Sequence, residues 1–410
     1  MSKPVKLLSL AVACACVLLA INFGMRASFG FFMTPISSEF GYGREIFAFS
    51  LALQNLCWGL FQPIAGAVAD RFGTAKTIYI GSIAYALGLY VTATADSFWG
   101  LHIGAGILVG MGIAGTGLGV VLPALARMVS LKQRGLALGI GTAAGSFGQL
   151  LVIPVAQEFI SAYGWQITLM ILAGGSLCML LLSGPFRNDG HQSAVTASEP
   201  SQTETQNQTL SEAVKEASGH LHYWLLIAGF FVCGFQLAFI TVHMPAYLSD
   251  NGFDARVAVI SLSLIGLFNI FGCLLFGSWS GKYSKKNLLG IIYLLRAIAI
   301  AGFMLTPMTT TTIYLFSIIT GFLWLATVPP TSGLVAQMFG LKHMGTLYGI
   351  VFLNHQLGSF LGVWLGGYLY DSTGSYDNVW WAAAAIALVT ATIHIVIDER
   401  PVSRLRMAAA

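Results

Sequence analysis

The stretch GAVADRFGTAK, residues 66–76, lies between two long apolar runs, and its first part recurs in weaker form much later in the chain. GAVADRFG at 66–73 aligns with GSWSGKYS at 277–284, an offset of 211 residues, and both copies follow an apolar run. A degenerate copy of one loop at so large an offset indicates an internal duplication of the kind found in membrane proteins built from repeats. We therefore predict a fold of two like halves.

Two further pairs of segments support the duplication. GMRASF at 24–29 matches GFQLAF at 234–239, and RGLALGI at 134–140 matches MGTLYGI at 344–350, both at an offset of 210. Each match joins one apolar run to the sixth run after it. Parallel six-helix halves related by an axis along the membrane normal are typical of rocking transporters, whose substrate site lies between the halves near mid-membrane.

The composition of the chain is that of a membrane protein. Of its 410 residues, 56% are hydrophobic and only 9% are charged, and the mean hydropathy is +0.77. A soluble protein carries about 25% charged residues, so too little polar sequence remains here to cover a soluble helical fold. The net charge of +4 does not indicate a nucleic-acid partner, because the basic residues are explained by membrane topology.

Apolar runs long enough to cross a hydrocarbon core of about 30 Å recur along nearly the whole chain. We predict an all-α polytopic membrane protein with twelve transmembrane spans, at residues 7–35, 45–69, 77–95, 99–126, 135–159, 165–184, 221–248, 256–280, 287–306, 312–338, 345–370 and 378–397. The polar segment 185–220 divides them six and six. The expected organisation is an N-terminal six-helix bundle (1–184), a cytoplasmic linker (185–220) and a C-terminal six-helix bundle (221–410), with a short amphipathic helix in LSEAVKEA.

The basic residues set the expected orientation. With both termini in the cytoplasm, only Arg44 and Arg256 among the Lys and Arg residues between spans fall outside, which is a strong positive-inside bias. The first 20 residues resemble a secretory signal, but no convincing cleavage site follows, and we interpret them as part of an uncleaved first span. We expect a monomeric multi-pass protein of the plasma membrane, here a bacterial inner membrane. The six cysteines have no metal-ligand spacing, so no metal and no cofactor is predicted.

The stretch GAVADRFGTAK resembles the loop signature of the major facilitator superfamily, G-x-x-x-D-R-x-G-x-x-[KR], and the copy at 277–284 stands where that family repeats it. Within the superfamily, RGLALGIGTAAGSFGQ at 134–149 and GMRASFGFFMTPISSEFG at 24–41 resemble the monocarboxylate porter and oxalate–formate antiporter branch. The resemblance covers essentially the whole chain and implies the twelve-helix major facilitator fold. One departure is that many members of the branch carry an arginine in span 8, where this chain has Cys273.

The resemblance also implies a cytoplasmic gate. In the family, the aspartate of the signature bonds the start of span 11 and an arginine at the end of span 4, which locks the halves together on the cytoplasmic side. Asp70 with Arg71 and Arg127 match those positions, while Gly66 and Gly73 are expected to permit close packing and a tight turn. The alternative for Arg71 is a topology signal alone.

An arginine inside the first span, in NFGMRASFG at 22–30, points to the substrate. A charged side chain at mid-membrane costs about 2.5–3.5 kcal/mol on insertion scales and usually faces a cavity. No Asp or Glu lies in the middle of any predicted span, so the expected counter-charge of Arg26 is the substrate, an organic anion held by the planar guanidinium. The alternative is that Arg26 snorkels to the outer interface.

Other polar side chains at mid-span depth predict a wet central cavity. The predicted substrate-binding residues are Arg26, Gln54, Asn55, Gln149, Gln236, His243, Asn269, Arg296, Asn354, His355 and Gln356. The alternative for each is a simple hydrogen bond between helices, and for Arg296 a bond to neighbouring carbonyls. His243 and His355 are also the candidate proton carriers, because histidine changes charge most easily near pH 7. The pair Pro329–Pro330 predicts a kink in span 10.

These features predict a secondary transporter that moves a small organic anion, a monocarboxylate, by alternating access with proton symport. Three alternatives stay open: uptake of a larger anionic nutrient such as a vitamin or siderophore, proton-driven efflux, and a substrate sensor of the same fold that does not transport. Efflux is disfavoured because GTAAGSFGQLLVIP at 141–154 lacks the Gly-Pro that is usual in span 5 of efflux members. The chain has no Walker sequence, HExxH or credible nucleophile elbow, so we do not expect an enzyme. The expected partners are the anion and the lipid bilayer.

Overall fold

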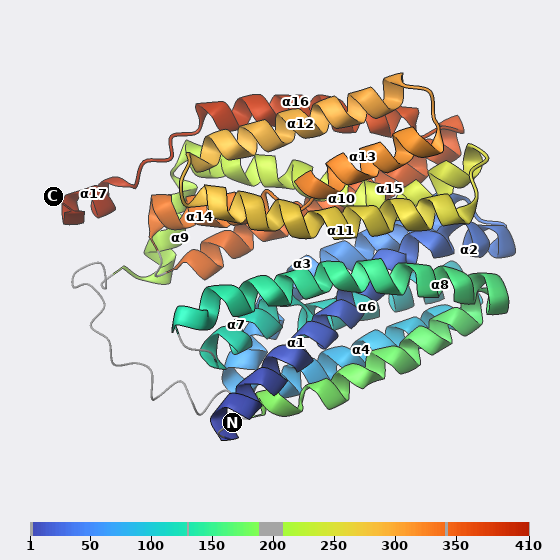
Figure 1. Cartoon of the computed structure of the whole chain (residues 1–410), viewed down its shortest axis with the longest axis horizontal. Helices are drawn as coiled ribbons and strands as arrows, with labels where there is room; N and C mark the ends of the chain where they lie inside the picture. The colour runs from blue at the N-terminus through green and yellow to red at the C-terminus, as the bar shows by residue number, and fades with distance from the viewer. Residues whose placement is uncertain (1–2, 129–130, 188–207, 341–342, 410) are drawn as a thin grey trace. The chain divides into compact units, whose positions relative to one another are not determined.

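The computed structural model describes residues 3–128, 131–187, 208–340 and 343–409; within these ranges, the side chains of residues 3–9, 70, 126, 131–138 and 407–409 are not described. Every regular element in these ranges is a helix (Figure 1). The expectation of an all-α fold is therefore confirmed for the described part of the chain.

The first six predicted spans all correspond to helices. They are α1 (Lys3–Ser28), η1 (Phe29–Phe32) and α2 (Met33–Phe40) for span 1, α3 (Arg44–Phe72) for span 2, α4 (Thr74–Ala93) for span 3, α5 (Phe98–Leu101), η2 (His102–Leu108), α6 (Val109–Thr116) and α7 (Leu118–Met128) for span 4, and α8 (Leu131–Leu182) for spans 5 and 6, followed by η3 (Gly184–Phe186). Gly164 divides α8 into two helices, because its φ of 80° and ψ of 170° are not helical. Such a conformation favours glycine, which has no Cβ.

The remaining predicted spans also correspond to helices. They are α10 (Leu221–Asp250), α11 (Ala255–Ser280), α12 (Lys285–Leu305), α13 (Thr310–Leu323) with α14 (Val328–Phe339), α15 (Met344–Thr373) and α16 (Asp377–Val396). Two shorter helices lie outside the spans, α9 (Leu210–Ser218) and α17 (Ser403–Ala409). The short helix expected in LSEAVKEA is confirmed as α9, and it begins with a capping box between Thr209 and Glu212.

Length and composition agree with a membrane protein. Eight helical stretches in the described ranges are long and apolar enough to cross a membrane, and one of them, Gly139–Leu182, covers two predicted spans. The other predicted spans are α3, α4 and α15. These helices carry more polar residues, among them the predicted site residues Gln54 and His355.

The helices form two compact units that do not follow the order of the chain. Unit 1 comprises Met1–Ala197, Ala238–Leu267 and Phe360–Tyr376, and unit 2 comprises Ser198–Leu237, Phe268–Ser359 and Asp377–Ala410. The helices α10, α11 and α15 therefore each contribute one part to unit 1 and another part to unit 2.

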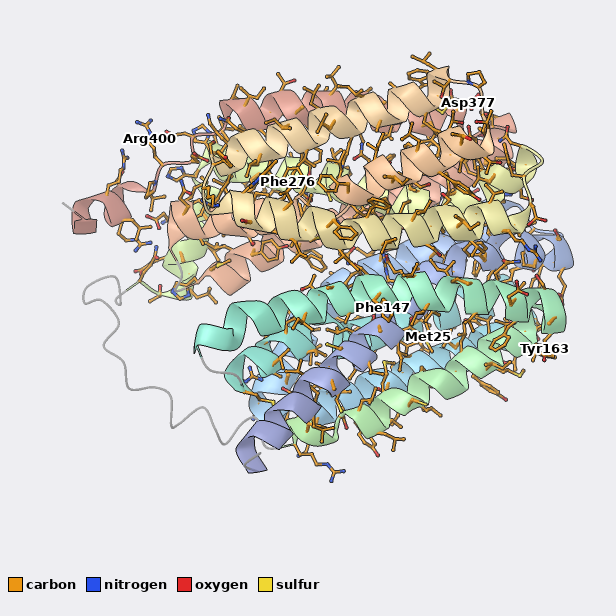
Figure 2. All side chains as sticks on the ribbon, in the orientation of Figure 1. Met25, Phe147, Tyr163, Phe276, Asp377 and Arg400 are labelled. Atoms are coloured by element: carbon orange, nitrogen blue, oxygen red, sulfur yellow. The ribbon has the colours of Figure 1, made fainter. Side chains whose placement is uncertain are left out.

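In unit 1, α1 packs along α8 (Figure 1). A Cβ added to Gly24 would lie 2.6 Å from the carbonyl oxygen of Gly148, and one added to Gly148 would overlap the backbone of Ala20. Farther along α8, a Cβ at Gly175 would lie 3.0 Å from the methyl group of Met25, a residue of α1 labelled in Figure 2. Small residues let two backbones approach closely, which is the usual basis of helix association in membranes.

In unit 2, α12 and α16 run side by side (Figure 1). A buried apolar cluster joins α11, α12 and the end of α13, and Figure 2 labels its α11 member Phe276. The other members of the cluster are Leu288, Ile292, Leu323 and Ala326. The cluster therefore adjoins the point at which span 10 is interrupted.

Candidate functional site

The guanidinium of Arg26 is held by neutral partners in unit 1. Its Nη2 donates to Oδ1 of Asn55 at 2.7 Å, and its Cζ lies 4.9 Å from the ring centroid of Trp58. Asn55 is itself fixed, because its Nδ2 donates to the carbonyl oxygen of Leu51 at 2.8 Å. The Nε of Arg26 is buried and has no hydrogen-bond partner in the described part of the chain. The arginine is therefore positioned by an amide and a ring, with one N–H group unused.

A second polar group, around Asn22, lies one helical turn before Arg26. The Nδ2 of Asn22 donates to Oγ1 of Thr116 at 2.5 Å, and the hydroxyl of Tyr85 donates to the backbone carbonyl of Asn22 at 3.3 Å. The Oδ1 of Asn22 is buried and has no partner among the described groups. Residues four apart share a helix face, so Asn22 and Arg26 belong to one polar stripe on α1.

Two predicted glutamines of unit 1 lie at helix contacts. Gln54 is 2% exposed, and its Nε2 donates at 2.8 Å to the carbonyl oxygen of Ala105 in η2. η2 is a π-helix, a rare form that is frequent at functional sites. Gln149 on α8 lies against α11, where a Cβ added to Gly266 would come within 3.3 Å of its Oε1. Gln54 therefore supports an irregular helix, while Gln149 marks a close approach of two helices.

Span 10 is interrupted between α13 and α14, which confirms the predicted kink. The backbone N–H of Val328 donates to the carbonyl oxygen of Leu325 rather than to that of Trp324, its acceptor in a regular α-helix. Pro329 and Pro330, in the first turn of α14, have no N–H to donate. The interruption at residues 324–327 thus leaves backbone groups that need partners from elsewhere.

Arg296 on α12 supplies the missing donors. It is 3% exposed, its Nη2 donates to the carbonyl oxygens of Leu323 (2.6 Å) and Trp324, and its Nε also reaches that of Leu323 at 3.2 Å. Its Nη1 lies 3.5 Å from Oε1 of Gln236, whose Nε2 donates to the carbonyl oxygen of Ala383 at 2.9 Å. The two predicted residues Arg296 and Gln236 are therefore brought together, and the arginine is bound to backbone carbonyls.

Asn269 on α11 supplies a hydrogen-bond acceptor to the interruption, whereas Arg296 supplies donors. Its Oδ1 accepts the backbone N–H of Leu325 at 3.0 Å and the thiol of Cys273 at 3.2 Å. Within the interruption, the hydroxyl of Thr327 lies 3.2 Å from the Sγ of Cys233 on α10. Side chains from three other spans therefore complete the hydrogen bonding of the break.

The three consecutive predicted residues on α15 have different environments in unit 2. Asn354 donates its Nδ2 to the carbonyl oxygen of Ile227 at 2.9 Å. His355 is 8% exposed, its ring centroid lies 4.8 Å from that of Phe230, and its Nδ1 has no partner in the described ranges. Gln356 is fully buried, and neither of its amide atoms has a partner there. Unpaired buried polar atoms are rare and often mark functional positions.

His243 on α10 lies in unit 1 and uses both of its ring nitrogens. Its Nε2 lies 2.8 Å from the carbonyl oxygen of Val363, and its Nδ1 lies 3.2 Å from the hydroxyl of Tyr376. The same hydroxyl accepts a hydrogen bond from Nη1 of Arg44 at 3.1 Å, and Arg44 pairs with both carboxylate oxygens of Asp250 at 2.6 Å.

Asp371 at the end of α15 binds the first turn of α3. Its carboxylate accepts the backbone N–H groups of Arg44 (2.9 Å) and Glu45 (2.7 Å). The carboxylate of Glu45 in turn accepts the indole N–H of Trp364 at 3.0 Å. The residues Arg44, Glu45, His243, Asp250, Asp371 and Tyr376 are called the Arg44 network below.

The family follows from a comparison over most of the chain. A family model described as the Major Facilitator Superfamily matches residues 15–363. The chain belongs to the major facilitator superfamily. It is therefore a transporter and not an enzyme, and its fold is the major facilitator fold of twelve transmembrane helices in two pseudo-symmetric six-helix halves.

Three relatives with similar sequences match this chain over most of their own length. The MFS-type transporter YcxA of Bacillus subtilis is 25% identical over 92% of this chain and 90% of its own. Monocarboxylate transporter 13 of Rattus norvegicus is 23% identical, over 93% of this chain and 86% of its own. Monocarboxylate transporter 12 of Homo sapiens is 24% identical, over 84% and 70% of the two chains.

Solved structures of the superfamily share the fold. A bacterial homologue of the human lysosomal transporter Spinster, inward-facing and unoccupied, matches 100% of this chain and 98% of its own with a TM-score of 0.73 and 15% identity. A D-xylose–proton symporter matches with a TM-score of 0.72 and 14% identity over 96% of this chain and 98% of its own. Identities this low support the fold alone.

The superfamily loop between α3 and α4 is partly described. Gly73 has a φ of 96° and a ψ of 145°, and forms the turn between the two helices. A Cβ added to Gly66 would meet no described atom within 4 Å, and the guanidinium of Arg71 lies 5.2 Å from the ring centroid of Phe72. Arg127 donates its Nη2 to Oγ1 of Thr74 at 3.1 Å. The side chain of Asp70, the expected gate partner, lies outside the described residues.

Sequence reasoning missed several residues that the structure places at these sites. Asn22 and Trp58 carried usable signals, since Asn22 precedes Arg26 by four positions and Trp58 follows Asn55 by three, both helix-face spacings. Asp371 and Tyr376 carried none, because their partner Arg44 is more than 320 positions away in the chain.

Proposed function

We propose that this transporter carries a small monocarboxylate across the membrane, coupled to protons by symport, and that Arg26 binds the carboxylate. In this proposal the protein is a monomer of a bacterial inner membrane with both termini in the cytoplasm. Its halves, residues 1–184 and 221–410, are joined by a cytoplasmic linker and alternate between inward-open and outward-open forms.

The environment of Arg26 carries the proposal. Its partners are an amide oxygen of Asn55 and the ring of Trp58, so the described contacts of the guanidinium include no carboxylate. A buried charge without a counter-charge is unfavourable, and a bound anion would supply one. The unpaired Nε gives the arginine an N–H group for a carboxylate oxygen once the substrate has entered. Stacking on Trp58 limits the rotation of the guanidinium, which favours a planar partner.

The relatives support the same class of substrate. Two of the proteins similar over most of this chain are named monocarboxylate transporters. The histidines are the proposed proton carriers because the spans offer no carboxylate at mid-depth. His355, whose Nδ1 is buried and unpaired, and Gln356 are the proposed polar contacts in unit 2.

The hydrogen bonds of the other predicted binding residues separate those that support helices from those that we propose as substrate contacts. Gln236, Asn269 and Arg296 bond the backbone of neighbouring spans, and Gln54 bonds η2, so we propose that these four support the helices that carry the site. The remaining proposed substrate contacts are Asn55 and Gln149 in unit 1 and Asn354 in unit 2. Asp70 and Arg127 are the proposed cytoplasmic gate.

A ligand screen with the purified protein tests the proposal. The thermal midpoint is measured with formate, acetate, L-lactate, pyruvate and benzoate, with acetamide and lactamide as uncharged controls and biotin as a larger anionic nutrient. A ligand at one hundred times its Kd stabilises the folded state by about 2.7 kcal/mol. We expect at least one small monocarboxylate to raise the midpoint while its amide does not.

Two outcomes would contradict the proposal. If the amides stabilise as well as the acids, the negative charge is not recognised. If only biotin stabilises, the substrate is a larger anion. Uptake of the stabilising acid into proteoliposomes, faster with an inward proton gradient, then separates a symporter from a sensor that binds without transporting.

A further inference from the structure

The direction of the hydrogen bonds at His243 follows from its acceptor. A backbone carbonyl only accepts, so the Nε2 of His243, 2.8 Å from the oxygen of Val363, carries the proton. The Nδ1 of the neutral ring is then an acceptor, and the hydroxyl of Tyr376 donates to it. The oxygen of that hydroxyl accepts from Nη1 of Arg44. Burial raises the pKa of Tyr376, which keeps this hydroxyl protonated.

The rest of the Arg44 network fixes the first turn of α3. The amide groups of Arg44 and Glu45 lie at a helix N-terminus, where no acceptor within the helix is available. Asp371 accepts both amides, and the guanidinium of Arg44 pairs with Asp250 at the end of α10. The guanidinium also lies 4.0 Å from the ring centroid of Tyr370. One end of α3 is therefore tied to the ends of α10 and α15, all within unit 1.

The imidazole ring of His243 is buried and tightly packed. It is 1% exposed, its ring centroid lies 5.1 Å from that of Tyr376, and a Cβ added to Gly366 would overlap the imidazole. The titratable and charged groups on the elements packed around it are Arg44 and Glu45 from α3, Tyr247 and Asp250 from α10, Tyr370 and Asp371 from α15, and Tyr376. Arg44 and His243 are both within 3.2 Å of one hydroxyl oxygen.

We propose that the Arg44 network is the closure at the outer ends of these helices, and that protonation of His243 releases it. A proton on Nδ1 turns that nitrogen from acceptor to donor, so the hydroxyl of Tyr376 loses its acceptor and must rotate. Protonation also makes His243 a second cation, beside the same hydroxyl oxygen that Arg44 contacts and in a buried site. Protonation and closure therefore oppose each other, and acid on the outside favours opening. This inference rests on the proposed proton symport and on the proposed orientation of the chain.

Amide exchange measures the closure directly. The amides of Arg44 and Glu45 are protected by Asp371, so their hydrogen–deuterium exchange reports whether the Arg44 network is intact. The full-length protein is placed in nanodiscs without any carboxylate and measured at several values between pH 5.5 and 7.5, with rates corrected for intrinsic exchange. We expect protection at these two amides to fall with acid, by up to about tenfold per pH unit, the limit for one linked proton.

Three variants test whether His243 and Asp371 cause the expected change in protection. His243→Gln keeps a donor for Val363 and an acceptor for Tyr376, so it should keep the protection and lose its pH dependence. Asp371→Asn should lower the protection at every pH, since an amide oxygen is a weaker acceptor than a carboxylate. Asp254→Asn is the matched control, because Asp254 caps the amide of Arg256 at 2.8 Å, outside the Arg44 network. It should change exchange at Arg256 only.

Two results would overturn the proposal: protection of Arg44 and Glu45 that does not change with pH in the wild type, or an unchanged pH dependence in His243→Gln. The second result would move the proton to another group of the network, such as Asp371. The measurement uses no substrate. A failed carboxylate screen therefore leaves this inference standing, and a pH-independent closure leaves the anion site at Arg26 standing.

Discussion

Two arginines inside membrane spans have different surroundings in this protein, and their acceptors indicate different roles. Arg296 is bound by the carbonyl oxygens of Leu323 and Trp324 and by Gln236, so its donors are used within the protein. Arg26 has one amide acceptor, a ring and an unpaired Nε. The cost of placing a charge in the membrane is therefore offset by backbone at Arg296, whereas at Arg26 we assign the offset to the substrate.

Arg26→Ala tests that assignment. A hydrogen bond to a charged group contributes about 1.5–3 kcal/mol, so the affinity for the stabilising carboxylate should fall by roughly one to two powers of ten. Arg26→Lys should give an intermediate loss, because lysine keeps the charge without the planar pair of donors. Isothermal titration of the purified variants measures both effects.

The control for these variants is Arg256→Ala, which removes an exposed arginine in the first turn of α11 and should leave affinity unchanged. If Arg26→Ala binds the carboxylate as tightly as the wild type, the anion site lies elsewhere.

The role of a single residue could be predicted from the sequence where its position within a membrane span was informative by itself. Arg26 is conspicuous because a charge in an apolar run is costly in itself. Asp371 could not be assigned a role in the same way, since an acid at the end of a span needs no explanation. Only the fold brings it to the amides of Arg44 and Glu45.

At the scale of the element, the interruption of span 10 is stabilised from outside by Arg296. Arg296→Gln should leave carbonyl groups of Leu323 and Trp324 without donors, and the free energy of unfolding should fall by about 2–4 kcal/mol, because each orphaned buried group costs about 1–3 kcal/mol. Arg296→Lys should recover part of this loss. Unfolding in mixed micelles measures it.

Tyr293→Phe provides the comparison, because it removes one buried hydrogen bond, 2.7 Å long, to the carbonyl oxygen of Gly229 in the continuous helix α10. That loss should be about 1 kcal/mol. An Arg296→Gln variant no less stable than Tyr293→Phe would show that the break does not depend on the arginine.

The turn between α3 and α4 offers a second test at this scale. Gly73 has a φ of 96° and a ψ of 145°, a region that only glycine adopts readily, so Gly73→Ala should cost about 1–3 kcal/mol in the free energy of unfolding. Gly66, inside α3 and with open space at its Cβ position, is the matched control. Gly66→Ala should be neutral or stabilise by up to about 1 kcal/mol. Equal effects in the two variants would contradict the strained turn.

The elements themselves were largely predictable, because twelve apolar runs of membrane-spanning length leave few alternatives. What the runs could not give is how each span is broken up. Span 4 is divided into α5, η2, α6 and α7, and its π-helical part is stabilised by Gln54 of α3. The extent of such an irregular segment depends on partners from other spans, and these are set by tertiary packing.

At the scale of the whole molecule, alternating access needs one closure on each side of the membrane. The proposed inner closure, Asp70 with Arg127, is implied by the resemblance of a local motif to the superfamily signature and stays a prediction from the sequence. The outer closure proposed here, the Arg44 network, has no motif, because its members come from α3, α10 and α15 and from the turn before α16. We therefore infer that the two closures oppose each other energetically.

Opposed closures predict opposite effects of two single substitutions. Arg44→Gln removes the pair with Asp250 but leaves the backbone amides bound by Asp371, so their exchange still reports the outer closure. A partly buried ion pair of good geometry contributes about 1 kcal/mol, and protection at positions 44 and 45 should fall roughly fivefold. Asp70→Asn weakens the inner closure, disfavours the outward-open form and should raise the same protection. Because positions 44 and 70 lie at opposite ends of α3, the double variant should lie near the sum of the single effects. If Asp70→Asn leaves the exchange at positions 44 and 45 unchanged, or lowers it as Arg44→Gln does, then the two closures are not coupled through one alternating transition.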